Sequence, residues 1–523
     1  MPLQDPGERE RRMYYHGLPS CPKLVARSST TPWNQPYEWP DRKRLFVATG
    51  HAIQQPWNDP NSSLQRLIIA TLDGIDWTAI DILRIGYESY GDDYRRIPER
   101  PVTMLISVST NSTTFQVAEA AIIACKEILT RFNLDDVEVE IKESVVTTAA
   151  SSSSSASSDL TTGRVPPRLN PGPFDNDLIN IKYSHLRNIS EYLGASIDLP
   201  SEFNEGTKCL YLQGNNGKTY ALTCRHALFS AEYLKEYRHG DGNETKCVRH
   251  PGSNSLSRLV ERFKDAKGGI DETILEMAKP AYADPECQAK LPDFLQEQAL
   301  LQSCQPRMEQ FDGEVSAVIG HVEFSPPIGL CSQGLRVRDW ALVELAQESF
   351  TTNLSKLRNK LPVTLELRLM LKRIPDVPAR LPLRLRFSSN EVAIGPDLIP
   401  ECELKGTAPS PSGETLFVIK HGLKTKFTIG IANGIDSVTR YTSDVGDVIS
   451  SEWCIIGTNG EAFSGAGDSG ACVFDPEGRI GGMITAGLKS QDYIYGYDVT
   501  YAAPMQWLLD EVKKEGYDLK LPN

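Results

Sequence analysis

A glycine-flanked serine near the C-terminal end is the residue best suited to chemistry in this sequence. Gly467-Asp468-Ser469-Gly470 reads as a tight turn that leads into the apolar strand 471–474. Glycines let the backbone bend so that the amides of Gly467 and Ser469 can converge on one point, as an oxyanion hole requires. The pattern predicts a nucleophilic serine for acyl transfer, although the same residue types are common in plain turns.

A base and a carboxylate for this serine lie upstream, each at the edge of a predicted strand. His226 ends a hydrophobic strand that is predicted to pair with residues 207–212, and Asp339 directly precedes the apolar segment 340–345. Acyl transfer at neutral pH needs a hydroxyl, a base within hydrogen-bond reach, a carboxylate that orients the base, and donors for the oxyanion. Taken singly, a histidine at a strand end is usually structural and an aspartate there is usually a cap.

The order of the three candidates along the chain narrows the choice. His, Asp and Ser follow one another as in chymotrypsin, whereas subtilisin and the α/β-hydrolases have other orders. Residues 179–523 resemble the chymotrypsin-like (trypsin-like) serine peptidase superfamily and are most similar to large intracellular trypsin-like peptidases of fungi. The resemblance rests on Thr-Cys-Arg-His-Ala, Arg-Asp-Trp-Ala-Leu-Val-Glu-Leu, Gly-Asp-Ser-Gly-Ala, a hairpin at 418–430, and the glycine-rich segment 478–487.

The resemblance implies a C-terminal all-β double β-barrel with the active site between the barrels, and a protein or peptide as substrate. His226 would act as general base and then acid, Asp339 would fix its tautomer, and Ser469 would attack the carbonyl. The amides of Gly467 and Ser469 would form the oxyanion hole. No cofactor and no metal are implied.

Two departures from the family concern specificity and activation. Phe463 stands where trypsin-type enzymes carry the residue of the pocket floor, which argues against an acidic floor for Lys or Arg and favours a substrate with an apolar P1 residue. The activation terminus of the secreted members is absent, so the sequence offers no visible partner for Asp468. The predicted substrate pocket consists of Phe463, Ser464, Ile484, Thr485 and Ala486.

The chain is expected to be multidomain. A β-α-β unit is predicted from a strand at 101–108, a helix at 115–132 that begins with a capping box at Thr113 and Gln116, and a strand at 137–142. The predicted division is an irregular tail at 1–34, a small α/β domain at 35–146, a Ser/Pro-rich flexible linker at 147–178, and a peptidase domain at 179–523 with a helical insertion at 231–310.

Composition argues against several classes of function. The formal net charge of −13 opposes binding to a nucleic-acid backbone. No apolar run is long enough for a membrane span, no signal peptide is visible, and eleven cysteines show no zinc-type spacing. An intracellular protein, cytoplasmic or nuclear, with free thiols is therefore expected, although Cys209 and Cys224 lie on predicted neighbouring strands and could pair.

Several alternatives remain open at this point. An active endopeptidase could process its own exposed Ser-rich linker. A catalytically silent peptidase fold could serve as a binding scaffold, and an esterase could use the same triad. The N-terminal domain or the helical insertion is expected to bind a protein partner.

Overall fold

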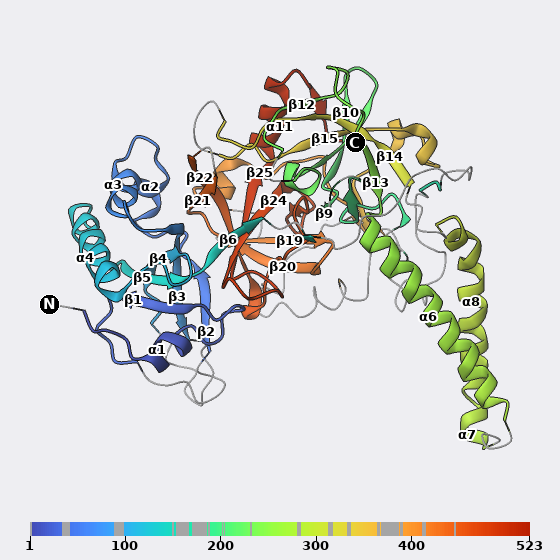
Figure 1. Ribbon diagram of the computed structural model, residues 1–523, viewed down its shortest axis with the longest axis horizontal. Coiled ribbons are helices and arrows are strands. Elements are labelled where there is room, and N and C mark those ends of the chain that lie inside the picture. The colour runs from blue at the N-terminus through green and yellow to red at the C-terminus, as the bar shows by residue number, and fades with distance from the viewer. Residues whose placement is uncertain are drawn as a thin grey trace.

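The computed structural model describes residues 3–33, 42–87, 99–148, 151–152, 167–169, 186, 189–200, 202, 204–230, 233–279, 284–311, 317–331, 336–362, 367, 386–387, 391–409, 415–443 and 446–522. Its architecture is mostly β, with a few helices around two large sheets and one small sheet (Figure 1). Within these ranges no helix is both long and apolar enough to cross a membrane. The small sheet contains β16 (Lys360–Pro362), β17 (Arg386–Phe387) and β18 (Glu391–Ala393).

The β-α-β unit predicted from hydrophobic periodicity is present. β4 (Val102–Val108) is wholly buried and runs parallel to β5 (Glu138–Glu143), with α4 (Phe115–Arg131) as the crossover. The capping prediction is wrong by one residue, because the hydroxyl of Thr114, not Thr113, accepts the hydrogen bond from the Val117 amide. The neighbouring elements are α2 (Gln54–Asn58), α3 (Leu64–Thr71), β2 (Lys43–Val47) and β3 (Trp77–Tyr87).

The segment 1–34, expected to be an irregular tail, contains two regular elements. It contains α1 (Glu8–Met13) and β1 (Lys23–Arg27), and β1 pairs antiparallel with β5 at the edge of the sheet. Leu24, Val25 and Ala26 are buried. Three apolar residues among polar neighbours are too short a pattern to distinguish an edge strand from a loop.

The flexible linker expected over residues 147–178 overlaps two short strands. β6 (Val145–Thr148) and β7 (Ser151–Ser152) each pair with a strand of the C-terminal region. Most of the remaining linker lies outside the described residues. Low complexity prevents a segment from building a core, but it does not prevent backbone pairing, because ladder hydrogen bonds need only the N–H and C=O groups.

One large sheet continues from the N-terminal module into the C-terminal region. β3 pairs antiparallel with β21, and the buried carboxylate of Asp81 accepts hydrogen bonds from Ser437 at 2.5 Å and Tyr501 at 3.0 Å. The sheet order is β1-β5-β4-β3-β21-β22-β20-β19-β23-β24-β25. Its C-terminal strands are β19 (Leu416–Gly422), β20 (Lys426–Ala432), β21 (Ser437–Ser443), β22 (Gly446–Gly457), β23 (Cys472–Phe474), β24 (Ile480–Lys489) and β25 (Val499–Pro504).

The second large sheet has the order β26-β10-β11-β15-β14-β13-β8-β9-β7, with β12 paired to β14. The predicted hairpin before His226 is confirmed, because β10 and β11 pair antiparallel. α11 (Met505–Lys514) leads from the first sheet back to β26 of the second. The strands are β8 (Ser196–Asp198), β9 (Asn204–Thr207), β10 (Leu210–Gly214), β11 (Thr219–Thr223), β12 (Tyr237–Arg238), β13 (Cys247–His250), β14 (Ala317–Ser325), β15 (Ala341–Leu345) and β26 (Leu519–Lys520).

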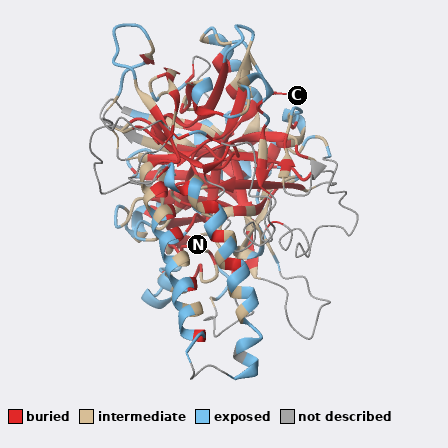
Figure 2. Ribbon diagram, turned by 90° about the vertical axis from the view of Figure 1, so that its right-hand side faces the viewer, coloured by how far each residue is buried: buried red, intermediate tan, exposed pale blue. Residues whose placement is uncertain are grey.

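The helical insertion is shorter than the predicted range 231–310. α6 (Ser253–Met277), α7 (Pro285–Gln288) and α8 (Leu291–Glu309) form an arm that projects from the body, whereas β12 and β13 occupy the first part of the range (Figure 1). The strands were missed because each is four residues or fewer. Several residues at the base of the arm are buried, and most residues toward its far end are exposed (Figure 2).

Candidate active site

Ser469 lies on the loop that enters β23, and two glycines shape this loop. Gly467 and Gly470 have φ angles of 110° and 87°, which L side chains rarely adopt. A Cβ on Gly470 would also lie 2.1 Å from the carbonyl oxygen of Thr207. Glycine is therefore required at both positions by the backbone conformation, and at Gly470 also by the close approach of Thr207. This close approach places the serine loop against the neighbouring sheet.

The structure brings the three candidate side chains together from the two large sheets. His226 follows β11 on the short helix η2 (Arg225–Ala227), and Asp339 precedes β15, which pairs with β11. His226 Nε2 lies 2.6 Å from Ser469 Oγ, and His226 Nδ1 lies 2.5 Å from Asp339 Oδ2. The other oxygen of Asp339 accepts the backbone N–H of His226 at 3.1 Å. All three residues are buried.

The hydrogen bond to Asp339 fixes the tautomer of the neutral imidazole. Burial raises the pKa of Asp339, but His226 and its hydrogen bonds outweigh burial, so the pKa lies below its ordinary value. A carboxylate can only accept hydrogen bonds, so Nδ1 carries the proton and Nε2 is left with a lone pair toward Ser469. This arrangement allows Nε2 to take the proton of the hydroxyl.

The amides predicted for the oxyanion hole are held in place from the other sheet. Thr207 on β9 donates its hydroxyl to the Gly467 carbonyl at 2.8 Å and its N–H to the Ser469 carbonyl at 2.7 Å. Within the described part of the chain, neither the Gly467 amide nor the Ser469 amide donates a hydrogen bond to a protein acceptor. Both donors are therefore available to an oxyanion.

Lys420 is a residue that the sequence interpretation missed. Its ammonium lies 3.2 Å from Asp468 Oδ2, and both side chains are fully buried. The same carboxylate accepts the Thr425 hydroxyl at 2.7 Å and the Lys424 amide at 2.7 Å. Burial raises the pKa of Asp468, but Lys420 and these bonds lower it below its ordinary value. The sequence feature that could have revealed Lys420 is its position as a lysine inside the apolar strand β19.

The predicted pocket residues occupy different surroundings. Thr485 lies next to the nucleophile, since its carbonyl oxygen is 3.3 Å from Ser469 Oγ. Ser464 is buried, with its hydroxyl 2.7 Å from that of Thr500. Phe463 and Ile484 belong to a buried hydrophobic cluster with Trp453, Ile455 and Ala502, and Ala486 is buried on β24. The role of these residues in specificity stays a prediction.

Donor groups suited to a metal occur at two places among the described residues. Cys224, His226 and Asp339 form one group, and burial raises the pKa of the Cys224 thiol well above its ordinary value. His321, Glu323 and Glu344 form the other, where Lys218 already pairs with Glu344 at 2.8 Å. Every cysteine whose side chain the structure describes has a free thiol, including Cys209 and Cys224.

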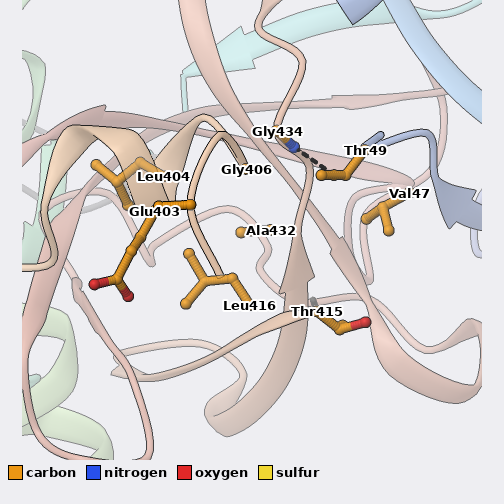
Figure 3. A pocket seen from close by; sticks show the side chains of 10 residues that line it. Val47, Thr49, Glu403, Leu404, Gly406, Thr415, Leu416, Ala432 and Gly434 are labelled. Carbon is orange, nitrogen blue, oxygen red and sulfur yellow. Dashed lines mark hydrogen bonds between the residues drawn. The ribbon is translucent and has the colours of Figure 1, made fainter. Parts of the chain in front are cut away.

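A small pocket lies elsewhere, where the N-terminal module meets the C-terminal region (Figure 3). Gly434 donates its amide to the Thr49 hydroxyl at 2.8 Å across it. Glu403 is its charged lining residue, and Arg479 already holds that carboxylate at 2.7 Å. The pocket has no nucleophile paired with a base, so it is not a candidate active site.

Behind Asp339, a buried carboxyl on β22 adds a pH-dependent charge. Glu452 accepts the Ser450 hydroxyl at 2.7 Å. The pKa of Glu452 is raised to about 7, mainly by burial and in smaller part by Asp436 and Asp339, while Arg336 and the Ser450 hydrogen bond oppose the rise. The folded protein therefore binds this proton more tightly than the unfolded chain does.

Glu452→Gln is expected to stabilise the protein above pH 7. Because the folded-state pKa of Glu452 is raised from 4.5 to about 7, the wild-type free energy of unfolding should fall as the pH rises through that interval. The full loss is on the order of 3 kcal/mol. Urea denaturation at pH 5 and pH 8 measures the effect, with the exposed Glu461→Gln as control. An equal difference between wild type and Glu452→Gln at both pH values would contradict the prediction.

No protein-family model and no curated protein matches this sequence. Among solved structures, the chain is similar to the Nocardiopsis protease NAPase, with 10% identity, a TM-score of 0.28, and coverage of 64% of this chain and 98% of that chain. It is also similar to a Cellulomonas bogoriensis chymotrypsin, with 10% identity, a TM-score of 0.25, and coverage of 63% and 97%. At these TM-scores the similarity carries no weight for function, which has to be inferred from the geometry of the site.

Proposed function

We propose that this chain is a serine endopeptidase with His226, Asp339 and Ser469 as its catalytic triad. The observation that supports the proposal is the continuous path of hydrogen bonds from Asp339 through the imidazole to the Ser469 hydroxyl. A plain turn serine and a structural histidine would have no reason to meet at 2.6 Å with a buried carboxylate behind them. The same three groups are what acyl transfer at neutral pH requires.

The reaction follows from the positions of the donors and acceptors. Nε2 of His226 removes the proton of Ser469 as Oγ attacks the substrate carbonyl, and Asp339 stabilises the imidazolium that forms. The amides of Gly467 and Ser469 donate to the oxyanion. His226 then gives its proton to the leaving amine, and water hydrolyses the acyl-enzyme by the same steps in reverse.

The proposed architecture of the catalytic unit is a double β-barrel of the chymotrypsin type. His226 follows a strand of the second large sheet and Asp339 precedes another, and Ser469 lies on the loop that enters strand β23 of the first. A cleft between two barrels accounts for residues from two sheets that share one site. In this architecture the helical arm is an insertion between the base and the acid, and its exposed end is the part suited to a protein partner.

Covalent labelling tests the proposed function. A small fluorophosphonate is expected to label the wild-type chain at one serine, Ser469, because only a serine activated by a base attacks phosphorus at a useful rate. Labelling should disappear in Ser469→Ala and persist in Ser257→Ala, a serine on the helical arm. An unlabelled wild-type chain with native circular dichroism would favour the catalytically silent scaffold instead.

A further inference from the structure

One edge of β24 carries a neighbouring strand, then the nucleophile, then a segment from the N-terminal part of the chain. Residues 480–483 pair antiparallel with β23. Further along, the Thr485 carbonyl oxygen lies 3.3 Å from Ser469 Oγ. Residues 486–489 then pair antiparallel with β6, while β25 holds the opposite edge of β24 (Figure 1). The place on this edge that directly follows the nucleophile is therefore taken by β6.

The backbone groups of Gly487 face β6. Leu488 directs its carbonyl oxygen to the opposite edge, where it accepts the Asp498 amide at 2.8 Å. Successive residues of a strand direct their N–H and C=O groups to alternate sides, so those of Gly487 face Thr147, its partner in the register. Opposed residues in this orientation exchange both of their hydrogen bonds. Thr147 thus uses the donor and the acceptor that β24 offers beside the nucleophile.

We infer that β6 is an internal competitor of the substrate, because it occupies the edge of β24 along which an extended polypeptide would be added to reach Ser469. The inference rests on the proposed function and adds the regulation of its site. A peptide that presents a carbonyl carbon to Ser469 has to pass Thr485, and an added strand finds its backbone partners on a sheet edge. Substrate and β6 therefore compete for the same groups of Gly487.

β6 is held less firmly than the strands beside it. Val145, Val146 and Thr147 are half-buried and Thr148 is exposed, whereas β24 and β25 are buried over almost their whole length. Among the strands that the structure describes, β24 is the one ladder partner of β6. Segments with few buried contacts open locally at a small cost in free energy. A substrate can therefore displace β6 without unfolding the rest of the chain.

The release of β6 leaves the N-terminal module attached to the C-terminal region. The β3–β21 ladder does not involve β6. Directly before β6, the Ser144 amide donates to the Val108 carbonyl at 3.0 Å, and the Ser144 carbonyl accepts the Thr78 hydroxyl at 2.8 Å. This anchor keeps a released β6 near β24, at a high effective concentration. The competitor therefore returns to the edge after each substrate has left.

Two substitutions are designed to weaken β6. Thr147→Pro removes the N–H that faces Gly487, and proline does not fit inside a ladder. Thr147→Ser keeps this N–H and is the matched control. Val146→Asp acts through the side chain, because Val146 packs against the hydrophobic cluster that contains Leu488 and Tyr501. Val146→Ile is its control.

Two phosphorus reagents separate access to the nucleophile from access to the edge of β24. The small fluorophosphonate needs no ladder, whereas a peptidyl diphenyl phosphonate, with Val-Val-Thr-Thr before an alanine phosphonate, has to pair with β24 in order to react. Thr147→Pro and Val146→Asp should each raise the ratio of the peptidyl labelling rate to the small-reagent rate about tenfold, as expected if β6 occupies the edge roughly nine-tenths of the time. Both control variants should keep the wild-type ratio.

Hydrogen–deuterium exchange of the wild-type chain tests the competition without a variant. After prolonged reaction with the peptidyl phosphonate, the Thr147 amide should exchange fast, because the reagent has replaced β6 on Gly487. After reaction with the small fluorophosphonate, the same amide should exchange as slowly as in the unreacted chain. Amides of the buried strand β4 serve as the internal control and should stay protected throughout.

The outcomes distinguish failure of this inference from failure of the proposed function. If the small reagent labels Ser469 but the ratio is the same in wild type, Thr147→Pro and Val146→Asp, the competition is overturned and the peptidase remains. A Thr147 amide that stays protected after peptidyl labelling has the same meaning, and it decides alone if both variants fail to fold. A chain with native circular dichroism that neither reagent labels would overturn both proposals.

Discussion

Ser469→Ala is expected to reduce the hydrolysis of a small p-nitrophenyl ester by a factor on the order of 10⁶, to the level of residual oxyanion and binding effects. The hydroxyl is the attacking group, and within the described residues no second hydroxyl is hydrogen-bonded to His226 Nε2. His226→Ala should cause a loss of similar size, because the hydroxyl then has no base. Steady-state ester hydrolysis measures both.

The double variant decides whether the residues act as one unit. Ser469→Ala combined with His226→Ala should be no slower than either single variant, since the removal of one partner already abolishes the proton transfer. Asp339→Asn should be milder, at about 10⁴-fold, because the amide still contacts the imidazole but favours the wrong tautomer. Multiplicative losses in the double variant would contradict a shared mechanism.

Lys420→Met is expected to destabilise the fold by about 3–5 kcal/mol, because it leaves the carboxylate of Asp468 buried without its cation. The pKa of Asp468 is depressed in the folded protein. The stabilisation from this pair is therefore present above the ordinary pKa of 3.8 and is lost as the pH falls through the lower folded-state value. Urea denaturation at pH 7 measures the change.

The same variant should also lose activity, because Asp468 precedes the nucleophile and holds the loop through the Lys424 amide and the Thr425 hydroxyl. Lys424→Met, at an exposed neighbouring lysine, is the matched control and should stay within about 0.5 kcal/mol of wild type. Lys420→Met combined with Asp468→Asn should regain much of the stability. A stable, fully active Lys420→Met would contradict a structural role for the pair.

The three residues of the proposed triad could be picked out from the sequence because each belongs to a local pattern. Ser469 carries glycines that the loop geometry requires, and His226 and Asp339 each stand at the edge of an apolar strand. The partner of Asp468 was not accessible in this way, because Lys420 is 48 residues away and only tertiary structure brings the two together. A lysine in an apolar strand indicates that it has a buried partner, but the sequence does not show which residue that partner is.

The wrong predictions share a physical cause. β1, β6 and β7 are short strands with few apolar residues, and each forms because a neighbouring strand offers free backbone groups. Side-chain patterns report which face of a strand is buried, not which edge it joins. For the same reason periodicity could predict strands, but it could not predict that β3 pairs with β21.

The ladder between β3 and β21 bears on how the protein can be divided for experiments. A shortened chain that begins at residue 179 would carry every residue of the proposed triad. It would lack β3, however, so the edge of β21 that pairs with β3 would expose unpaired N–H and C=O groups. Exposed strand edges of this kind recruit other chains. Such a fragment would be prone to aggregate, and co-expression of residues 1–149 would be the natural way to keep it in solution.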